Sequence, residues 1–362
     1  MKRTRAVLLA IRVACAAAAV VRLSRARHRR PPLVAEATFN DGESVSVVVP
    51  ARDEAARIRP LLDALSGAPG VCEVIVLDDE STDGTSAIAA ASGARMIAGA
   101  PQPAGWVGKA WALEQGIRAA TGEWVVTLDA DTRPSPLLPA TLVARARRDG
   151  LEFVTVGGRF ECPTAGTAWL HPAMLTTLVY RFGPPDGARP QRAGRLLANG
   201  QCMAFAREPF LAGGGMAPVS DRLVEDVALA RHLAGQGSSV AMLDGPTLLT
   251  TRMFETGRGA WGGWSRSLAL PGVEPAWRQV VDLTIVAVAQ ALPLPRVLLR
   301  RGDVLDVALL AIRLGTLAGT SGAYERRGAA YWLSPLADVP ATVALAAGIG
   351  RRRHRWRGRT YS

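Results

Sequence analysis

Acidic residues gather where apolar runs of the sequence end, and the densest group is DDESTD at residues 78–83. So many negative charges are costly to cluster unless hydrogen-bond donors or a cation use them. The base and ribose of a nucleotide present such donors, whereas the polar residues at 81–83 could also simply cap the next helix. Asp78 and Asp79 are therefore candidate nucleotide-binding residues.

Asp129 and Asp131 form a second candidate site, in the segment TLDAD that ends another apolar run. Alternation along a strand turns both side chains to the same side. Paired hard oxygen ligands suit Mg²⁺ or Mn²⁺, which keep positions open for substrate phosphates. The cation would offset the charge that builds on a departing nucleoside diphosphate. Such a pair is common by chance. The acidic cluster at 78–83, which ends another strand of the same predicted sheet about fifty residues earlier, supports the functional interpretation.

Two further acidic segments border the predicted site. Pro50, Asp53 and Glu54 follow the run VVV, and ligands of parallel sheets bind at the carboxyl ends of the strands. Glu225 and Asp226 open a predicted helix, where one carboxylate could accept a proton from an acceptor hydroxyl, a step typically worth a factor of about 10²–10⁴. In both segments the acidic residues could instead only complement the helix dipole.

The elements that must position these residues alternate along the chain. Strands are predicted at 45–49, 73–77 and 124–128, and helices at 54–65, 85–91 and 109–120. Alternation with short connections predicts an α/β fold with a mostly parallel sheet covered by helices on both faces. Continuous apolar runs such as VVV are typical of central strands that are buried on both faces.

The composition favours a membrane surface as a partner. Hydrophobic residues make up 49% of the 362 residues, yet the net charge is +12, and arginines crowd residues 22–30 and 351–359 beside apolar segments. Such clusters suit anionic lipid, each cation adding about 1 kcal/mol. Nucleic acid is not expected, because the central region has neither a basic stripe nor interleaved aromatic residues. The scattered cysteines and histidines predict neither a zinc site nor disulfides, which indicates a reduced, cytoplasmic setting.

Apolar segments at both ends predict membrane attachment. The run 6–23 is just long enough to cross a bilayer, although Arg12 interrupts it. A signal peptide is the alternative, but the basic run that follows favours an uncleaved anchor. Three apolar blocks follow residue 275, at 280–299, 304–320 and 332–350, and Pro293 and Pro295 should kink the first. Buried core helices are the other interpretation of these blocks.

The predicted organisation is therefore an anchor with its basic flank at 1–30, a linker at 31–44, a catalytic domain at 45–275, membrane helices at 276–350 and a basic tail at 351–362. The expected location is the cell (inner) membrane, with the catalytic domain on the cytoplasmic side. Charge alone does not choose the topology, because both flanks of the first segment and the tail are basic.

The order of these motifs resembles a known family. VVVPARDE, LDDESTDGT, LDAD and VEDVALA follow one another as in the family 2 glycosyltransferases of the GT-A fold, across about residues 44–270. GWVGKAWALEQG at 105–116 and NGQC at 199–202 are similar to the hopene-associated and carotenoid (diaponeurosporenoate-type) branch. The resemblance implies transfer of a sugar from a nucleotide-sugar to an apolar lipid-like acceptor, and the expected donor is a UDP-sugar.

The resemblance also implies roles for individual residues. Asp53 or Glu54, together with Asp79, should lie by the base and ribose of the donor. Asp129 and Asp131 should hold the diphosphate and the metal, with Asp131 as the direct ligand. Lys109 stands where the branch places a lysine near the diphosphate. Asp226 should be the general base of a single in-line displacement, which would invert the sugar.

The chain departs from the processive members of the family, because it lacks their QxxRW motif. RGAWGGWSR stands at 258–266 in its place, which favours transfer of a single sugar. Trp261, Trp264 and Arg266 are candidates for shaping the acceptor end. Three alternatives stay open: a polyprenyl-phosphate sugar synthase, a non-catalytic membrane scaffold, and a nucleotidyltransferase. The last usually has a glycine-rich phosphate loop after its first strand, and PARDEAAR contains no glycine.

Overall fold

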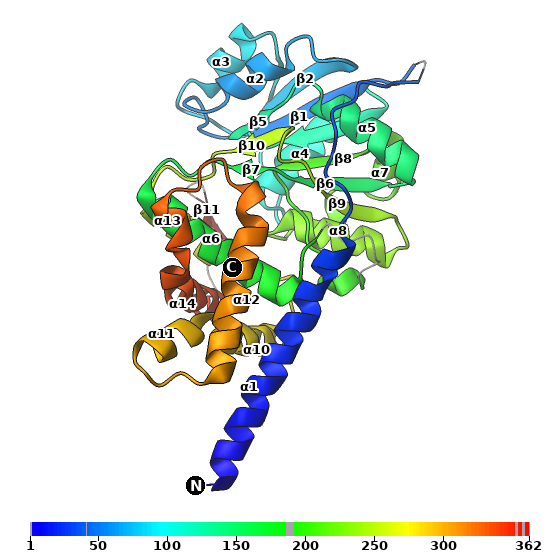
Figure 1. The fold of residues 1–362 in the computed structure, drawn as a ribbon. Helices are drawn as coiled ribbons and strands as arrows, with labels where there is room; N and C mark the ends of the chain where they lie inside the picture. The colour runs from blue at the N-terminus through cyan, green and yellow to red at the C-terminus, as the bar shows by residue number, and fades with distance from the viewer. Residues whose placement is uncertain (1, 41, 186–191, 352–353, 357–358, 362) are drawn as a thin grey trace.

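The computed structural model describes residues 2–40, 42–185, 192–351, 354–356 and 359–361. Figure 1 shows a sheet with its covering helices at one end of the molecule and a group of helices at the other. The long first helix, α1 (Lys2–Leu23), runs through the helical end and carries the N-terminus away from the sheet.

The main sheet has seven strands. Their order is β3 (Arg95–Ala98), β2 (Val71–Asp78), β1 (Val45–Ala51), β4 (Trp124–Leu128), β8 (Cys202–Ala206), β6 (Phe153–Gly157) and β9 (Val240–Asp244). Neighbouring strands are parallel except at β8, which runs antiparallel to β4 and β6. The predicted mostly parallel α/β sheet is thus confirmed.

Alternation along the central strand builds a core on each face of this sheet. Val47 and Val49 of β1 lie in one apolar cluster together with Leu142, and Val48 lies in another with Leu113. The helices that supply these cores are α2 (Arg59–Leu65), α3 (Thr85–Ala91), α4 (Gly108–Ala119), α5 (Leu138–Asp149), α7 (Arg207–Ala212) and α8 (Glu225–Gly235). A strand buried on both faces explains the unbroken VVV run.

A small second sheet lies beside the carboxyl end of β4. Its strands are β5 (Thr132–Pro134), β10 (Leu249–Thr251) and β7 (Arg159–Phe160), in that order. β5 begins directly after Asp131, and the Thr132 hydroxyl donates a hydrogen bond of 2.7 Å to the carbonyl of Asp129. This sheet therefore holds the residues that directly follow the LDAD segment.

One predicted helix starts later than expected. The prediction was 54–65, whereas α2 begins at Arg59. Asp53 has a left-handed φ of 53°, and the N–H of Glu54 donates to the hydroxyl of Thr85 rather than to a helical carbonyl. Pro60 then stands in the first turn of α2, where its missing N–H costs nothing. The segment between the strand and α2 is therefore a turn that reaches toward α3.

The helical end is built around α6 (Ala165–Phe182), which packs against α1, α9 (Gly257–Ser267) and α14 (Asp338–Ile349). The other helices here are α10 (Ala276–Val286), the π-helical turn η4 (Ala287–Ala291), α11 (Pro293–Leu298), α12 (Val304–Thr320) and α13 (Ala329–Trp332). Short 3₁₀ turns lie at η1 (Ser24–His28), η2 (Ala193–Arg195), η3 (Ala217–Val219), η5 (Ser321–Ala323) and η6 (Ser334–Ala337), and β11 (His354–Trp356) pairs with β12 (Arg359–Tyr361).

Three helical segments are long and apolar enough to cross a membrane: Arg3–His28, Ala276–Leu298 and Val304–Ala323. The second is interrupted at Pro293, as predicted, where α11 begins after a π-helical turn. The predicted apolar block at 332–350 is not one helix, because Pro335 starts a separate 3₁₀ turn between α13 and α14. The predicted tail at 351–362 lies largely outside the residues whose side chains the structure describes.

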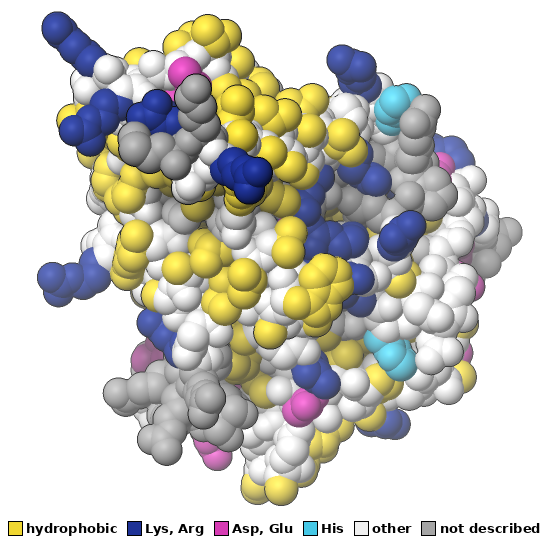
Figure 2. All heavy atoms as spheres, turned by 90° about the horizontal axis from the view of Figure 1, so that it is seen from below, with side chains coloured by type: hydrophobic (Ala, Val, Ile, Leu, Met, Phe, Trp, Pro, Cys, Tyr) yellow, Lys and Arg dark blue, Asp and Glu magenta, His cyan; other side chains and the backbone are white. Residues whose placement is uncertain are grey.

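Apolar side chains gather on the face remote from the main sheet. Figure 2 shows them as a broad area with lysine and arginine side chains around it. Exposed residues of this helical end include Val7, Val21, Val281, Leu298 and Val343. Apolar surface of this kind, rimmed by polar residues, marks a site of contact with a membrane or another protein.

Arg12, which interrupts the first apolar run, has acidic partners. Its guanidinium lies 2.6 Å from Asp303 and 2.8 Å from Asp306, at the start of α12. Arg313 inside α12 likewise lies 2.8 Å from Asp338 of α14. These pairs remove much of the cost of placing the arginines in apolar helices.

Candidate active site

Lys109 joins two of the predicted acidic segments. Its ammonium lies 2.8 Å from an oxygen of Asp129, after β4, and 3.0 Å from an oxygen of Glu225, at the start of α8. Burial alone would lower the pKa of Lys109, but the two carboxylates hold this pKa above its ordinary value. Lys109 is therefore a fixed positive charge at the meeting point of β4, α4 and α8.

Asp131 is buried beside other carboxylates. Burial, with the nearby charges of Asp129 and Glu54, raises the pKa of Asp131 to about 7. Its Oδ1 atom is buried and has no hydrogen-bond partner. A buried carboxylate oxygen of this kind is costly unless a cation or donor occupies the space before it.

A divalent cation fits this arrangement when a substrate supplies further oxygens. In the described part of the chain, no group of three or more His, Cys, Asp or Glu residues is placed to hold a metal ion alone. Mg²⁺ and Mn²⁺ sites commonly use one or two carboxylates plus substrate phosphates. The unpartnered Asp131 oxygen, with Asp129 beside it, matches that donor set.

Asp226 lies at the first turn of α8, held by backbone donors. The N–H of Gly200 donates to Oδ2 at 2.7 Å, and the N–H of Val227 donates to Oδ1 at 2.8 Å. Burial, together with the charge of Glu225, raises the pKa of Asp226 to about 7 despite these hydrogen bonds and the nearby Lys109. A carboxylate with a pKa near neutrality is suited to accept a proton in catalysis.

The absence of a side chain at Gly200 leaves room for this contact. A Cβ atom added at Gly200 would lie 3.1 Å from the Cβ of Asp226 and 3.2 Å from its Oδ2. The loop before β8 is further held by Asn199, whose side-chain amide donates to Gln201 and to the carbonyl of Val156. The NGQC segment therefore positions Asp226 through its backbone.

The nucleotide-binding candidates lie at the carboxyl ends of β1 and β2. Arg52 approaches Asp79 at 3.4 Å, and Glu54 pairs with Arg57 at 2.6 Å. The backbone N–H of Asp79 donates to the carbonyl of Ala51, which joins the two strand ends. Pro50, Glu54 and Asp79 all line the same cavity as Asp131 and Asp226.

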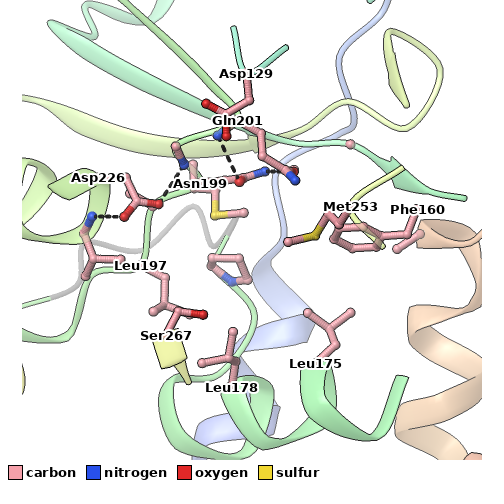
Figure 3. Close-up of a pocket in the computed structure, with 18 of the residues that line it drawn as sticks. Asp129, Phe160, Leu175, Leu178, Leu197, Asn199, Gln201, Asp226, Met253 and Ser267 are labelled. Atoms are coloured by element: carbon pink, nitrogen blue, oxygen red, sulfur yellow. Dashed lines mark hydrogen bonds between the residues drawn. The ribbon is translucent and has the colours of Figure 1, made fainter. Parts of the chain in front are cut away.

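This cavity has a volume of about 1210 Å³ and two parts. The polar arm is lined by Glu54, Asp79, Lys109, Asp129, Asp131, Glu225 and Asp226. The apolar arm is lined by Leu23 and Ala26, by Leu175, Leu178 and Val179, and by Ile312, Gly315, Thr316 and Gly319. Figure 3 shows Asp129 and Asp226 on one side of the open space and Leu175 and Leu178 on the other.

Some predicted residues lie away from the cavity wall. Asp53 accepts hydrogen bonds from the backbone N–H and the hydroxyl of Thr82, and Asp78 accepts one from the N–H of Ser81. Both hold the strand-end loops together, while the cavity is lined by their neighbours. Trp264 and Arg266 line the cavity, but the partly exposed Trp261 does not.

Other cavity residues were not predicted. Arg52 and Arg57 line the polar arm, and Phe160 and Met253 lie beside the apolar arm. Arg52 stands inside the PARDE segment, so its proximity to Asp53 and Glu54 was the available signal. Phe160 and Met253 come from segments without a motif, and only the fold brings them to the cavity.

Known proteins resemble this chain in sequence and in fold. Residues 46–212 match the model of the family described as Glycosyl transferase family 2. Two relatives are 4,4'-diaponeurosporenoate glycosyltransferases. The one from Staphylococcus haemolyticus is 24% identical over 234 residues, covering 63% of this chain and 62% of the relative. The one from Staphylococcus aureus (strain USA300) is 24% identical over 261 residues, covering 67% and 65%. The match thus spans less than two thirds of either relative.

The fold has a counterpart among solved structures. A mannosyltransferase from Pyrobaculum calidifontis, in complex with GDP-Man and Mn²⁺, superposes with a TM-score of 0.59 at 20% identity. The superposition covers 95% of this chain and 96% of the other. The superposition shows a GT-A-type fold, and within it residues 46–212 are similar to the glycosyl transferase family 2.

Proposed function

We propose that the protein transfers a single sugar, with inversion, from a nucleotide-sugar to an apolar, lipid-like acceptor at a membrane. The observation that carries this proposal is the continuity of one cavity from the carboxylates at the sheet edge to the apolar helices. The relatives named as diaponeurosporenoate glycosyltransferases support a lipid-like acceptor. Residues 45–275 would be the catalytic unit and residues 276–350 its membrane attachment.

The polar arm would bind the donor. Asp79, Glu54 and Arg52 line the end of the cavity at β1 and β2, where the base and ribose of the nucleotide would lie. Asp129 and Asp131 would hold Mg²⁺ or Mn²⁺ against the diphosphate, and the cation would offset the negative charge of the leaving group. Lys109 is held 2.8 Å from Asp129 and would add a second positive charge there. The Pyrobaculum structure, solved with GDP-Man and Mn²⁺, supports this donor chemistry.

Asp226 would act as the general base. It would accept the proton of an acceptor hydroxyl while the acceptor oxygen forms a bond to the anomeric carbon of the sugar. The bond from that carbon to the diphosphate breaks in the same step, and its electron pair leaves with the nucleoside diphosphate. One displacement of this kind inverts the anomeric centre. The hydrogen bonds from Gly200 and Val227 would keep the carboxylate in place.

The experiment measures release of nucleoside diphosphate by the purified, detergent-solubilised protein. UDP-glucose and GDP-mannose are supplied separately with Mn²⁺, with and without a bacterial lipid extract. We expect lipid-dependent release with one donor and its loss in Asp226→Asn, by about 10²–10⁴-fold. Asp221→Asn is the matched control, because Asp221 is exposed and pairs only locally with Arg222. Equal activity of the two variants would contradict the role of Asp226, and release that ignores lipid would contradict the acceptor.

The membrane location is tested separately. The three apolar helical segments and the exposed apolar face support attachment to a membrane, and the side we propose is the cytoplasmic face of the cell membrane. Fractionation of cells that express the protein should leave it in the membrane pellet after a high-salt wash. Labelling of the exposed Cys72 by a membrane-impermeant maleimide should require broken cells. Labelling of intact cells would reverse the proposed orientation.

A further inference from the structure

The wall that α12 presents to the apolar arm is made partly of glycine. Gly315 and Gly319 line the cavity, one helical turn apart on the same face. Small residues at this spacing usually allow two membrane helices to pack closely. Here a Cβ atom added at either glycine would meet no other atom within 4 Å. These glycines therefore face open space, and they widen the cavity instead of serving a helix contact.

Ion pairs tie α1 and α12 together at the end away from the main sheet. Arg12 of α1 lies within 2.8 Å of Asp306 and within 2.6 Å of Asp303, at the start of α12. Both helices pack against α6, and Figure 1 shows the Asp303 end of α12 remote from the sheet. Closer to the sheet, Leu23 at the end of α1 lines the same cavity as the glycines of α12. The two helices thus form the sides of a cleft with α6 as its floor.

Apolar side chains are exposed on both helices, close in sequence to residues that line the cavity. On α1 the side chains of Val20 and Val21 are exposed, and on α12 the side chain of Leu314 is exposed. All three belong to segments long and apolar enough to cross a membrane. The floor is formed by Leu175 and Leu178 of α6, which are only partly buried. A hydrocarbon chain matches the apolar side chains along this path.

We propose that the cleft between α1 and α12 is a lateral portal, through which the apolar chain of the acceptor enters from the bilayer and lies on α6. The proposal rests on the proposed function, because it supplies the route by which a lipid acceptor reaches Asp226. The occupant is a single hydrocarbon chain whose polar end points to Asp226. The chain passes beside Leu178 and Ser267, which lie between the helices and the carboxylate in Figure 3.

The first test needs no catalytic turnover. The full-length protein is reconstituted in phosphatidylcholine vesicles with hexadecanol that carries a diazirine on its terminal carbon, and the photolabelled residues are mapped. We expect labelling of Leu175 and Leu178, as well as of the exposed reference residue Val21. Excess unlabelled hexadecanol should suppress the α6 labels and leave the Val21 label. Absence of competable α6 labelling would overturn the portal.

Variants of α12 give the second test. Gly315→Leu with Gly319→Leu places two side chains in the open space, and leucine favours a helix over glycine. We expect α6 labelling relative to Val21 to fall by about ten-fold, a change of about 1.4 kcal/mol in binding. Ala318→Leu is the matched control, since Ala318 is exposed on the same helix and does not line the cavity. Equal labelling in the double variant and the control would overturn the proposal.

Binding of UDP and GDP with Mn²⁺, measured by titration calorimetry, separates this proposal from the proposed function. The glycine variants should bind the nucleotide as the unaltered protein does, because the polar arm is untouched. Failure of the unaltered protein to bind either nucleotide would contradict the proposed function even if α6 is labelled. Nucleotide binding without competable α6 labelling would contradict the portal alone.

Discussion

Asp131 and Asp226 at the sheet edge differ in their pairing from the carboxylates among the apolar helices. Asp282 lies within about 3 Å of both Arg22 and Arg195, and Asp338 accepts hydrogen bonds from Arg313 and Gln290. Asp131, in contrast, has a buried oxygen without a partner, and Asp226 is held only by backbone N–H donors in the described structure. Removing one partner of a buried pair destabilises a structure, whereas an unpaired carboxylate is kept available for a ligand. The helical charges are therefore structural, and the sheet-edge charges are candidates for chemistry.

The sharpest test of this comparison is Asp131→Asn. We expect sugar transfer to fall by about 10²–10³-fold, because the cation that offsets the leaving-group charge loses a ligand. The free energy of unfolding should stay the same or rise, because a buried, unpartnered charge is removed. Nucleoside diphosphate release and thermal unfolding in the same detergent measure the two effects. A destabilised variant would show that Asp131 is a structural residue.

Asp282→Ala should give the reverse pattern. Its carboxylate is almost fully buried and faces Arg22, Arg181 and Arg195. Removing one side of a buried ion pair leaves uncompensated charge and typically costs about 3–5 kcal/mol. We expect the melting temperature to fall while binding of UDP or GDP at low temperature is retained. Val281→Ala, at an exposed neighbouring position, is the control, and an equal effect of both variants would contradict the structural role.

A smaller and more local effect is expected from Gly200→Ala. The added methyl group would lie 3.1 Å from the Cβ of Asp226, so the carboxylate must shift. Misplacing a catalytic group costs rate without a comparable loss of stability, here about ten-fold in kcat with little change in donor KM. Gly235→Ala, near the end of α8 where an added Cβ meets no atom within 4 Å, is the control. An unchanged kcat would show that Asp226 tolerates the shift.

The fold and most residues of the polar arm could be predicted from the sequence, whereas the residues of the apolar arm could not. Strand 124–128 and helix 85–91 were predicted with the bounds that the structure shows, because apolar runs and polar breaks mark both ends. Asp129 and Glu225 are adjacent to strand and helix ends, so topology alone suggested that they approach each other. Lys109, which pairs with both carboxylates, was predicted as a site residue only from the family resemblance.

The elements that sequence reasoning missed depend on tertiary contacts. A turn stands at 54–58 where a helix was predicted, and the N–H of Glu54 there donates to Thr85, a residue of α3. Pro335 lies in the 3₁₀ turn that separates α13 from α14. A prediction based on apolar residues alone does not detect this break. Leu175, Phe160 and Met253 reach the cavity from three distant segments, and no local pattern of apolar residues distinguishes a cavity wall from a packed core.

The smallest predicted effect concerns Glu73, a paired carboxylate within the sheet domain. Burial alone would raise its pKa, but hydrogen bonds from Thr121 and Ser46 and the nearby Arg95 lower the pKa to about 2. Because the folded-state pKa is depressed, its stabilisation is present above the ordinary pKa of 4.5 and is lost as the pH falls toward 2. After allowance for solvent screening we expect a loss of about 1 kcal/mol across this window. The Glu73→Gln variant should lose less stability between pH 5 and pH 2.5 in denaturant unfolding. If its pH profile matches that of the unaltered protein, pairing at this strand does not contribute to stability, and the contrast with Asp131 would hold only for the helical end.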